Sequence, residues 1–395
     1  MPNTKNLLVM QSGGPTPVIN RSLFGVFDEA TKSGSFANIF GAHRGIEGVL
    51  DDRLIDLSRT SQTEWGKITA TPGSALGTTR RKLADNDLPN VVEFVSRHRI
   101  THWLMIGGND SAETALATST AANQAGLDLT VMHVPKTVDN DLVGTDHCPG
   151  YGSAARFVAA ATQGAGRDAE AMGDAAPVTI LEVAGRDSGW LAAAAVLGKR
   201  EERDAPHVIV VPELPFDESH FLSQIESAYR KYGFAVAVVQ ENIQDATGRP
   251  LGNQTNPMYV DDFGHEYYEG AGRYLTAITA KHLGVRVRYD RPGTIQRSMA
   301  ALVSSVDAEE AEIVGRAAVR YALDGETEEM VSIVRQQNNP YASTTGLTPL
   351  EQVAGAVKIM PSDFLNAEGM ATQAFVDYAR PLIGEALPEL GRIAM

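Results

Sequence analysis

The stretch Asn6-Leu7-Leu8-Val9-Met10-Gln11-Ser12-Gly13-Gly14-Pro15 decides the fold class. An apolar run of strand length leads directly into two glycines, and a helical pattern follows over residues 18–27. The apolar residues do not alternate with polar ones, which is typical of a parallel strand that is covered on both faces. Strand, glycine-containing loop and helix in this order predict the first unit of an α/β doubly wound sheet.

The same pattern recurs along the chain. Further apolar runs predict buried strands over residues 103–106, 129–134, 178–183, 208–211 and 235–239. Ala-rich amphipathic segments between them predict helices. Because 395 residues exceed one ordinary core, we expect two doubly wound, Rossmann-like sheets that face each other across a cleft.

Two other segments depart from this pattern. Residues 244–268 are rich in Gly, Asn, Asp and Pro, which predicts a long surface excursion. Near the C-terminus, residues 330–334 predict a closing strand, and the chain after it is expected to be a mostly irregular tail.

Composition excludes several classes of partner. The chain has 34 basic and 49 acidic residues, a net charge of −15, so nucleic acid and anionic membranes are unfavourable partners. A single cysteine excludes an internal disulfide, and no apolar stretch approaches the roughly 20 residues of a membrane-spanning helix. We therefore expect a cytoplasmic protein, in which any phosphate site must gather arginine and lysine locally.

Glycines and charged residues follow five of the predicted strands. The loops are Gln-Ser-Gly-Gly-Pro (11–15), Gly-Gly-Asn-Asp-Ser (107–111), Pro-Lys-Thr-Val-Asp-Asn-Asp (135–141), Ala-Gly-Arg-Asp (184–187) and Pro-Glu (212–213). Ligands of doubly wound sheets bind where loops leave the carboxyl ends of the strands. The sequence therefore predicts one polar cleft formed by these loops.

The loop at residues 135–141 carries the most specific signal. Asp139 and Asp141 lie two residues apart, and Lys136 precedes them. One carboxylate can accept a proton from a hydroxyl while its neighbour binds a metal ion, and the lysine can neutralise a phosphate. An Asx-rich turn is the alternative, and it explains Asn140 but not the lysine.

The two glycine loops are less specific. Ser12-Gly13-Gly14 stands before a helix, where backbone N–H groups and the helix dipole favour an anion, but two glycines also serve simply to turn the chain. Asp110 is either a ligand for Mg²⁺ or the N-terminal cap of the next helix.

Arginines accompany these loops. Arg80 follows a glycine-containing stretch, Arg186 ends a strand, and Arg288, Arg291 and Arg297 surround residues 292–296. Guanidinium groups suit phosphate well, although a lone arginine such as Arg291 can also be merely solvated. Several arginines near strand ends in an acidic chain favour phosphorylated ligands.

Taken in order, these motifs resemble the phosphofructokinase family over most of the chain. The matching blocks are residues 12–14, 73–80, 107–111, 135–141, 182–186, 212–213 and 293–297. The tail Ile-Val-Arg-Gln-Gln-Asn-Asn-Pro-Tyr (333–341) is similar to the longer bacterial branch that uses pyrophosphate.

The resemblance implies Mg²⁺-dependent transfer of a phosphoryl group from pyrophosphate to the 1-hydroxyl of fructose 6-phosphate. By this resemblance Asp139 is the general base. Mg²⁺ and the donor phosphates are organised by Asp110 and Asp141. The donor is held by Gly13, Arg80 and Lys136.

The resemblance also assigns the sugar phosphate. Fructose 6-phosphate is expected to bind Thr137, Arg186, Glu213, Arg288 and Arg297, with the arginines on the 6-phosphate and Glu213 on the sugar hydroxyls. A donor-binding domain is expected over residues 1–145 with part of 300–395, and a sugar-phosphate-binding domain over residues 146–299. The cleft of the family is completed at a subunit contact, which implies a homodimer.

Two positions indicate the donor. ATP-using relatives carry glycine where this chain has Asp110 and Lys136, and these larger side chains would crowd out a nucleotide.

The alternatives are an ATP-dependent kinase on the same scaffold, another acceptor, and a non-catalytic binding protein. Ala184, where relatives usually have methionine, would favour an acceptor such as sedoheptulose 7-phosphate, whereas the intact loop 136–141 argues against a loss of catalysis. Asn109 stands where many relatives have a metal-binding aspartate.

Overall fold

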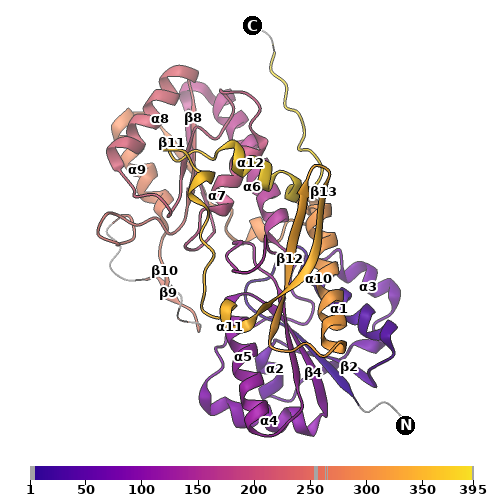
Figure 1. Cartoon of the computed structure of the whole chain (residues 1–395). Coiled ribbons are helices and arrows are strands. Elements are labelled where there is room, and N and C mark those ends of the chain that lie inside the picture. The colour runs from indigo at the N-terminus through magenta and orange to yellow at the C-terminus, as the bar shows by residue number, and fades with distance from the viewer. Residues whose placement is uncertain (1–4, 253–256, 263, 265, 394–395) are drawn as a thin grey trace.

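The computed structural model describes residues 5–252, 257–262, 264 and 266–393, and within them two mostly parallel sheets form the framework (Figure 1). The first sheet has the order β13-β12-β5-β4-β1-β2-β3 and the second the order β11-β6-β8-β7. The first sheet comprises β1 (Asn6–Gln11), β2 (Asn38–Ala42), β3 (Leu54–Asp56), β4 (Ile100–Gly107), β5 (Thr130–Pro135), β12 (Glu329–Asn338) and β13 (Tyr341–Pro349). The second comprises β6 (Val178–Val183), β7 (Val208–Val210), β8 (Ala235–Gln240) and β11 (Val287–Asp290). This confirms the α/β class.

Helices cover both faces of the first sheet, as the continuous apolar strands predict. In β1, Leu7 and Val9 pack toward α1 (Ile19–Ser33), α3 (Gln62–Ile68) and α10 (Ser305–Leu323). Leu8 and Met10 point to the opposite face, which is covered by α2 (Ile46–Leu50), α4 (Leu88–Arg97) and α5 (Asn109–Gln124). The two edge strands, β3 and β13, pair antiparallel with their neighbours, and the strands between them are parallel.

The second sheet is also covered on both faces. One face packs against α6 (Tyr151–Met172) and α7 (Trp190–Ala193), and the other against α8 (Glu218–Tyr232) and α9 (Ala271–Leu283). None of the helices in the described part of the chain combines the length and apolar character needed to cross a bilayer. Short 3₁₀ turns lie at Leu57–Arg59, Asp85–Asp87, Gly173–Ala175, Ala194–Gly198, Gly293–Arg297, Ala300–Leu302, Ser362–Phe364 and Pro381–Ile383.

The prediction of a mostly irregular C-terminal tail is wrong. Strand β12 continues to Asn338, β13 returns antiparallel beside it, and α11 (Leu350–Val353) and α12 (Gln373–Ala379) follow. Strand β13 reads YASTTGLTP and is mostly half-exposed, so it has no buried apolar run to reveal it. In Figure 1 the yellow C-terminal segment leaves α11 beside the first sheet and reaches α12 beside the second.

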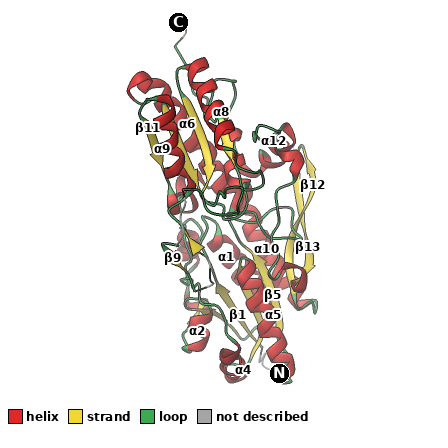
Figure 2. Ribbon diagram, turned by 90° about the vertical axis from the view of Figure 1, so that its left-hand side faces the viewer, coloured by secondary structure: helices red, strands yellow, loops and turns green. Residues whose placement is uncertain are grey.

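The predicted excursion at residues 244–268 contains secondary structure. It carries the short strands β9 (Tyr259–Val260) and β10 (Glu266–Tyr267), which pair antiparallel, and Figure 2 shows β9 near the boundary between the two sheets. Residues 253–256, 263 and 265 of this predicted excursion lie outside the described residues.

A buried ionic cluster ties the β12–β13 hairpin to the segment that follows β5. The His147 side chain is 2% exposed, with Nδ1 2.7 Å from Asp146 Oδ1 and Nε2 2.6 Å from Glu310 Oε2. Arg335 Nη2 on β12 lies 2.8 Å from the same Asp146 oxygen, and Tyr341 on β13 donates to Glu310 at 2.6 Å. The tail is therefore fixed by charge pairs as well as by strand pairing.

This cluster predicts a dependence of stability on pH. Burial lowers the pKa of His147, but Glu310 and Asp146 outweigh it and the pKa is raised. A raised pKa stabilises the fold fully below the unfolded value near 6.5, and the contribution is lost as pH rises through the folded value. We expect His147→Gln to lower the free energy of unfolding by about 3 kcal/mol at pH 6 and by less at pH 9, measured by urea unfolding.

His102→Gln is the control for this prediction. Burial lowers the pKa of His102 to about 4, so its contribution to stability should not decline above pH 7. An equal loss for His147→Gln at pH 6 and pH 9 would contradict a charged imidazole in the cluster.

Candidate active site

Loops at the carboxyl ends of strands from both sheets line a cavity of about 290 Å³. The loops after β1, β4 and β5 contribute from the first sheet, and those after β6, β8 and β11 from the second. Of the predicted site residues, the cavity is lined by Gly13, Arg80, Asp110, Lys136, Thr137, Asp139, Asp141, Arg186 and Arg297. The other two predicted residues, Glu213 and Arg288, do not line it.

Positive charge converges on the first glycine loop. Lys136 Nζ donates to Gly14 O at 2.8 Å, and Arg297 from the other sheet lies so close to Gly14 that any side chain there would overlap its guanidinium. Gly13 has φ +76°, a left-handed conformation that glycine adopts without strain. Burial and the neighbouring Arg297 and Arg186 lower the pKa of Lys136 to about 7. Such a concentration of cations in an acidic protein indicates an anion site.

Asp139 lines the same cavity as these cations. Burial and the neighbouring Asp141 raise the pKa of its carboxyl to about 7, while Arg186, whose Nε is 3.8 Å from Oδ2, opposes the rise. The Asp139 N–H donates to Thr137 Oγ1 at 3.1 Å, and Ser188 Oγ donates to the Asp139 carbonyl at 3.1 Å. A mostly buried carboxyl whose pKa is raised to about 7 is suited to accept a proton from a substrate hydroxyl.

Two non-glycine residues of the site adopt left-handed backbone conformations. Asn140 has φ 58° and Arg186 has φ 51°. This region is sparsely populated by residues with a side chain, and such backbone conformations cluster at functional sites. Asn140 stands between the two carboxylates, so its conformation determines how Asp139 and Asp141 leave the backbone.

Arg80 is held by the excursion of the second sheet. Its Nη1 lies 2.7 Å from Oδ2 of Asp261, which directly follows β9 and is buried. The ion pair brings residues 259–261 against the cavity edge of the first sheet, a contact that the predicted excursion does not anticipate.

The acidic residues of the cavity fit a metal ion that arrives with a phosphate. Asp110 is in the first turn of α5 and Asp141 is buried, and both line the cavity. Within the described residues, no group of three or more His, Cys, Asp or Glu side chains is placed to hold a metal by itself. Mg²⁺ is ordinarily bound through one or two carboxylates together with substrate phosphates and water, so two carboxylates suffice.

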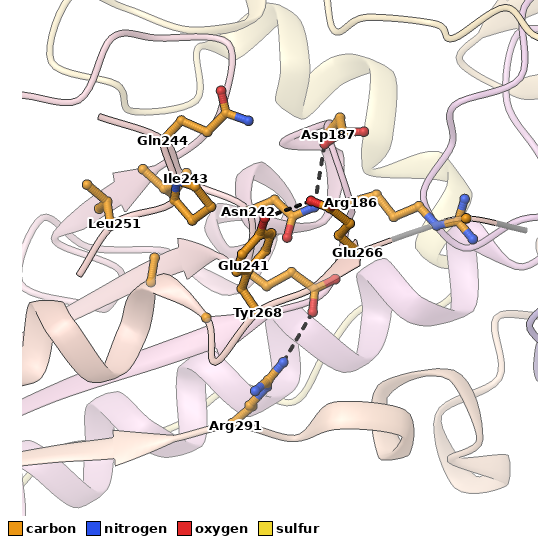
Figure 3. A pocket seen from close by; sticks show the side chains of 14 residues that line it. Arg186, Asp187, Glu241, Asn242, Ile243, Gln244, Leu251, Glu266, Tyr268 and Arg291 are labelled. Carbon is orange, nitrogen blue, oxygen red and sulfur yellow. Dashed lines mark hydrogen bonds and ion pairs between the residues drawn. The ribbon is translucent and has the colours of Figure 1, made fainter. Parts of the chain in front are cut away.

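A second cavity of about 350 Å³ adjoins the first, and Arg186, Glu241 and Arg291 line both. Figure 3 shows Arg291 directed toward Glu241, with Nη2 3.5 Å from Oε2. Arg291 Nε also lies 2.9 Å from the buried Glu182, so Arg291 is anchored rather than merely solvated.

Comparison with known proteins decides the family. The family model described as phosphofructokinase matches residues 6–322. The chain belongs to the phosphofructokinase family.

Relatives of known type extend over almost the whole chain. A pyrophosphate–fructose 6-phosphate 1-phosphotransferase of Rhodospirillum rubrum is 38% identical, with 98% of this chain and 96% of the relative covered. One from Xanthomonas campestris pv. campestris is 40% identical, covering 96% and 92%. The crystal structure of a pyrophosphate-dependent phosphofructokinase from Nitrosospira multiformis superposes with a TM-score of 0.89 at 33% identity, covering 99% of this chain and 95% of that one.

Two residues that the phosphofructokinase resemblance assigns to the sugar, Glu213 and Arg288, do not line this cavity in the single chain. Glu213 Oε1 accepts from the Gly189 N–H at 2.8 Å, and its Oε2 is buried without a hydrogen-bond partner among the described residues. Arg288 on β11 forms an ion pair with Asp168 of α6. Arg288 lies within β11 and Glu213 lies three residues after the end of β7, so neither occupies the position directly after a strand that Glu241 occupies.

Glu241 is the carboxylate that the sequence prediction lacks. It directly follows β8, where a predicted strand ends, and it lines both cavities. The signal that reveals Glu241 is the same one that reveals Asp139 and Arg186, a charged residue at the carboxyl end of a buried strand.

Proposed function

We propose that the chain reversibly transfers a phosphoryl group from inorganic pyrophosphate to the 1-hydroxyl of D-fructose 6-phosphate, giving D-fructose 1,6-bisphosphate and phosphate. The observation that carries this function is the buried Lys136, which stands with Arg297 at the first glycine loop beside a carboxyl that titrates near pH 7. Relatives with the same reaction in their names, matched over nearly their full length, support it.

In this mechanism Asp139 takes the proton of the sugar 1-hydroxyl as the hydroxyl oxygen attacks the donor phosphorus. Gly13, Arg80 and Lys136 hold the donor, and the cations stabilise charge that develops on the transferred group. Mg²⁺, when bound with the donor, would be held by Asp110 and Asp141 and would neutralise charge on the phosphate oxygens. The protein's contribution is mainly positioning and electrostatics.

The sugar phosphate is assigned to the side of the cavity formed by the second sheet. We assign Thr137, Arg186 and Arg297 to fructose 6-phosphate, and Glu241 to its hydroxyls in place of Glu213. Glu241 and Asp139 line the same cavity, and Glu241 contributes to the raised pKa of Asp139. A sugar hydroxyl bound by Glu241 would therefore lie close to the base.

A pair of substitutions tests this assignment of the sugar. Glu241→Gln is expected to raise the KM for fructose 6-phosphate about tenfold or more, because a carboxylate–hydroxyl hydrogen bond contributes about 1.5–3 kcal/mol. Glu213→Gln is expected to change that KM less than twofold, since Glu213 contacts Gly189 outside the cavity. Steady-state kinetics of both variants decides between them, and a larger effect from Glu213→Gln would restore the original assignment.

We propose the following domain division and assembly. Residues 1–145 with part of 300–395 form the donor domain, supported by β12 and β13 in the first sheet, and residues 146–299 form the sugar-phosphate domain. A homodimer is supported by the exposed apolar side chains of Ile295 and Met299, which lie close to Arg297 in the sequence. In a homodimer, Arg288 of one chain could reach the cavity of the other chain. Analytical ultracentrifugation of the purified chain tests the assembly: the mass of two chains supports the homodimer, and the mass of one chain contradicts it.

The reaction is tested by supplying fructose 6-phosphate and Mg²⁺ with either pyrophosphate or ATP and measuring fructose 1,6-bisphosphate. We expect turnover with pyrophosphate and none with ATP, and we expect fructose 6-phosphate to form when the bisphosphate and phosphate are supplied. Turnover with ATP alone would overturn the donor assignment. Absence of fructose 1,6-bisphosphate with both donors would overturn the proposed reaction.

A further inference from the structure

The C-terminal segment contacts the loop that carries Asp139 and Asp141. The phosphofructokinase family model ends at residue 322, so this segment lies beyond it. The Lys358 N–H donates to the Asp141 carbonyl at 2.7 Å. The Tyr378 hydroxyl accepts from Asn140 Nδ2 at 2.9 Å and donates to the Asp146 carbonyl at 2.8 Å.

Asn140 is the point at which these contacts meet. It is fully buried, it adopts φ 58°, and it stands between the two carboxylates. Its Oδ1 accepts from the Cys148 N–H at 3.1 Å and from Lys358 Nζ at 3.3 Å, while its Nδ2 donates to Tyr378. Asparagine is one of the few residues with a side chain that adopt a left-handed conformation readily, and these hydrogen bonds fix its side chain in place.

Tyr378 is itself fixed in place. Its ring centroid lies 4.6 Å from the Arg335 guanidinium, and Arg335 Nη1 donates to the Tyr378 carbonyl at 3.0 Å. Trp190 and Phe364 pack on it with ring centroids 5.4 Å and 5.3 Å away. The hydroxyl is therefore presented to Asn140 from a rigid support.

We propose that Tyr378 and Lys358 are positioning residues that hold Asn140 in its left-handed conformation and thereby aim Asp139 and Asp141 into the cavity. The C-terminal segment is then part of the catalytic apparatus, although none of these side chains lines the cavity. The inference rests on the proposed role of Asp139 as the base. Displacing a reacting group by about 1 Å can lower a rate about 100-fold, so a modest shift of the loop would be visible in kcat.

Two tyrosines of the same cluster provide a matched experiment. Tyr341 also lies over Arg335, with its ring centroid 5.2 Å from the guanidinium, but its hydroxyl donates to Glu310 instead of contacting Asn140. Each Tyr→Phe variant therefore removes one hydroxyl and keeps the ring on Arg335. We expect Tyr378→Phe to lower kcat about tenfold or more with both KM values within twofold, and Tyr341→Phe to leave kcat within twofold.

Hydrogen–deuterium exchange supplies a readout that does not require turnover. The Asp139 and Cys148 N–H groups donate to Thr137 Oγ1 and Asn140 Oδ1, so loosening of Asn140 should speed exchange over residues 137–148. We expect faster exchange there in Tyr378→Phe and unchanged exchange in Tyr341→Phe.

Equal kcat losses in the two variants, or wild-type kcat and exchange in Tyr378→Phe, would overturn the positioning role. A wild-type protein without pyrophosphate turnover would instead overturn the proposed function, and the exchange comparison would still decide whether Tyr378 holds the loop.

Discussion

Asp139→Asn is expected to lower kcat by about 10³-fold while the KM values for fructose 6-phosphate and pyrophosphate change less than threefold. Asparagine has nearly the same size and can keep the backbone hydrogen bond to Thr137, but its amide cannot take the proton of the sugar hydroxyl. General base catalysis contributes typically about 10²–10⁴-fold, so the loss should appear in the chemical step. Initial rates over a grid of both substrate concentrations measure it.

Asp187→Asn is the matched control for Asp139→Asn. Asp187 lines the adjoining cavity, and Figure 3 shows it joined to Asn242, whose Nδ2 donates to Oδ1 at 3.4 Å. Neutralising this carboxylate changes the charge near the site without touching the proposed base, so kcat should stay within threefold. A change of KM alone in Asp139→Asn would assign Asp139 to binding and leave the base unidentified.

The sequence predicts five interior strands because burial determines them. Strands β1, β4, β5, β6 and β8 are covered on both faces, and each is mostly apolar. The edge strands β3, β11 and β13 and the short interior strand β2 escape prediction, whereas β7, also at an edge, is predicted from its apolar run. Hydrogen bonds between strands leave little trace in composition.

The candidate site is predictable to the extent that it follows from topology. Parallel strands end at one edge of a sheet, and this places Asp110, Lys136, Asp139 and Arg186 around one cavity. Contacts between residues that are far apart in the sequence do not follow from the strand order. Asn140 and Tyr378 are 238 residues apart, and nothing in either local sequence indicates that they meet. The same holds for Arg80 and Asp261.

Lys136→Met is expected to lower kcat/KM for pyrophosphate by about 10²–10³-fold, with the KM for fructose 6-phosphate within threefold. The Lys136 ammonium is buried beside Gly13 and Gly14, where removal of one stabilising charge from a water-excluded site has effects of this order. Burial of the ammonium lowers its pKa, which means that the protein holds it at a cost in stability. The melting temperature of Lys136→Met should therefore equal or exceed that of the wild type.

Lys82→Met is the control for the loss of positive charge. Lys82 is exposed and pairs with Glu113 at 3.3 Å, so its removal should leave both kinetic constants within twofold. If Lys136→Met lost stability and kept kcat/KM for pyrophosphate, the lysine would be a structural residue.

Switching the donor from pyrophosphate to ATP requires more than Lys136→Met, because Asp110 also lines the cavity. Lys136→Met should lose pyrophosphate turnover without gaining ATP turnover, since the Asp110 carboxylate still takes up space and adds negative charge where further nucleotide phosphates must bind. Asp110→Gly/Lys136→Gly reproduces the glycines of the ATP-using relatives that the sequence resembles, and it is expected to gain measurable ATP turnover. If this variant lost pyrophosphate turnover and still showed no turnover with ATP, donor selection would reside in other parts of the cavity wall. One of these is the adjacent Asn109, which is anchored by its hydrogen bond to the Ala356 carbonyl at 3.0 Å.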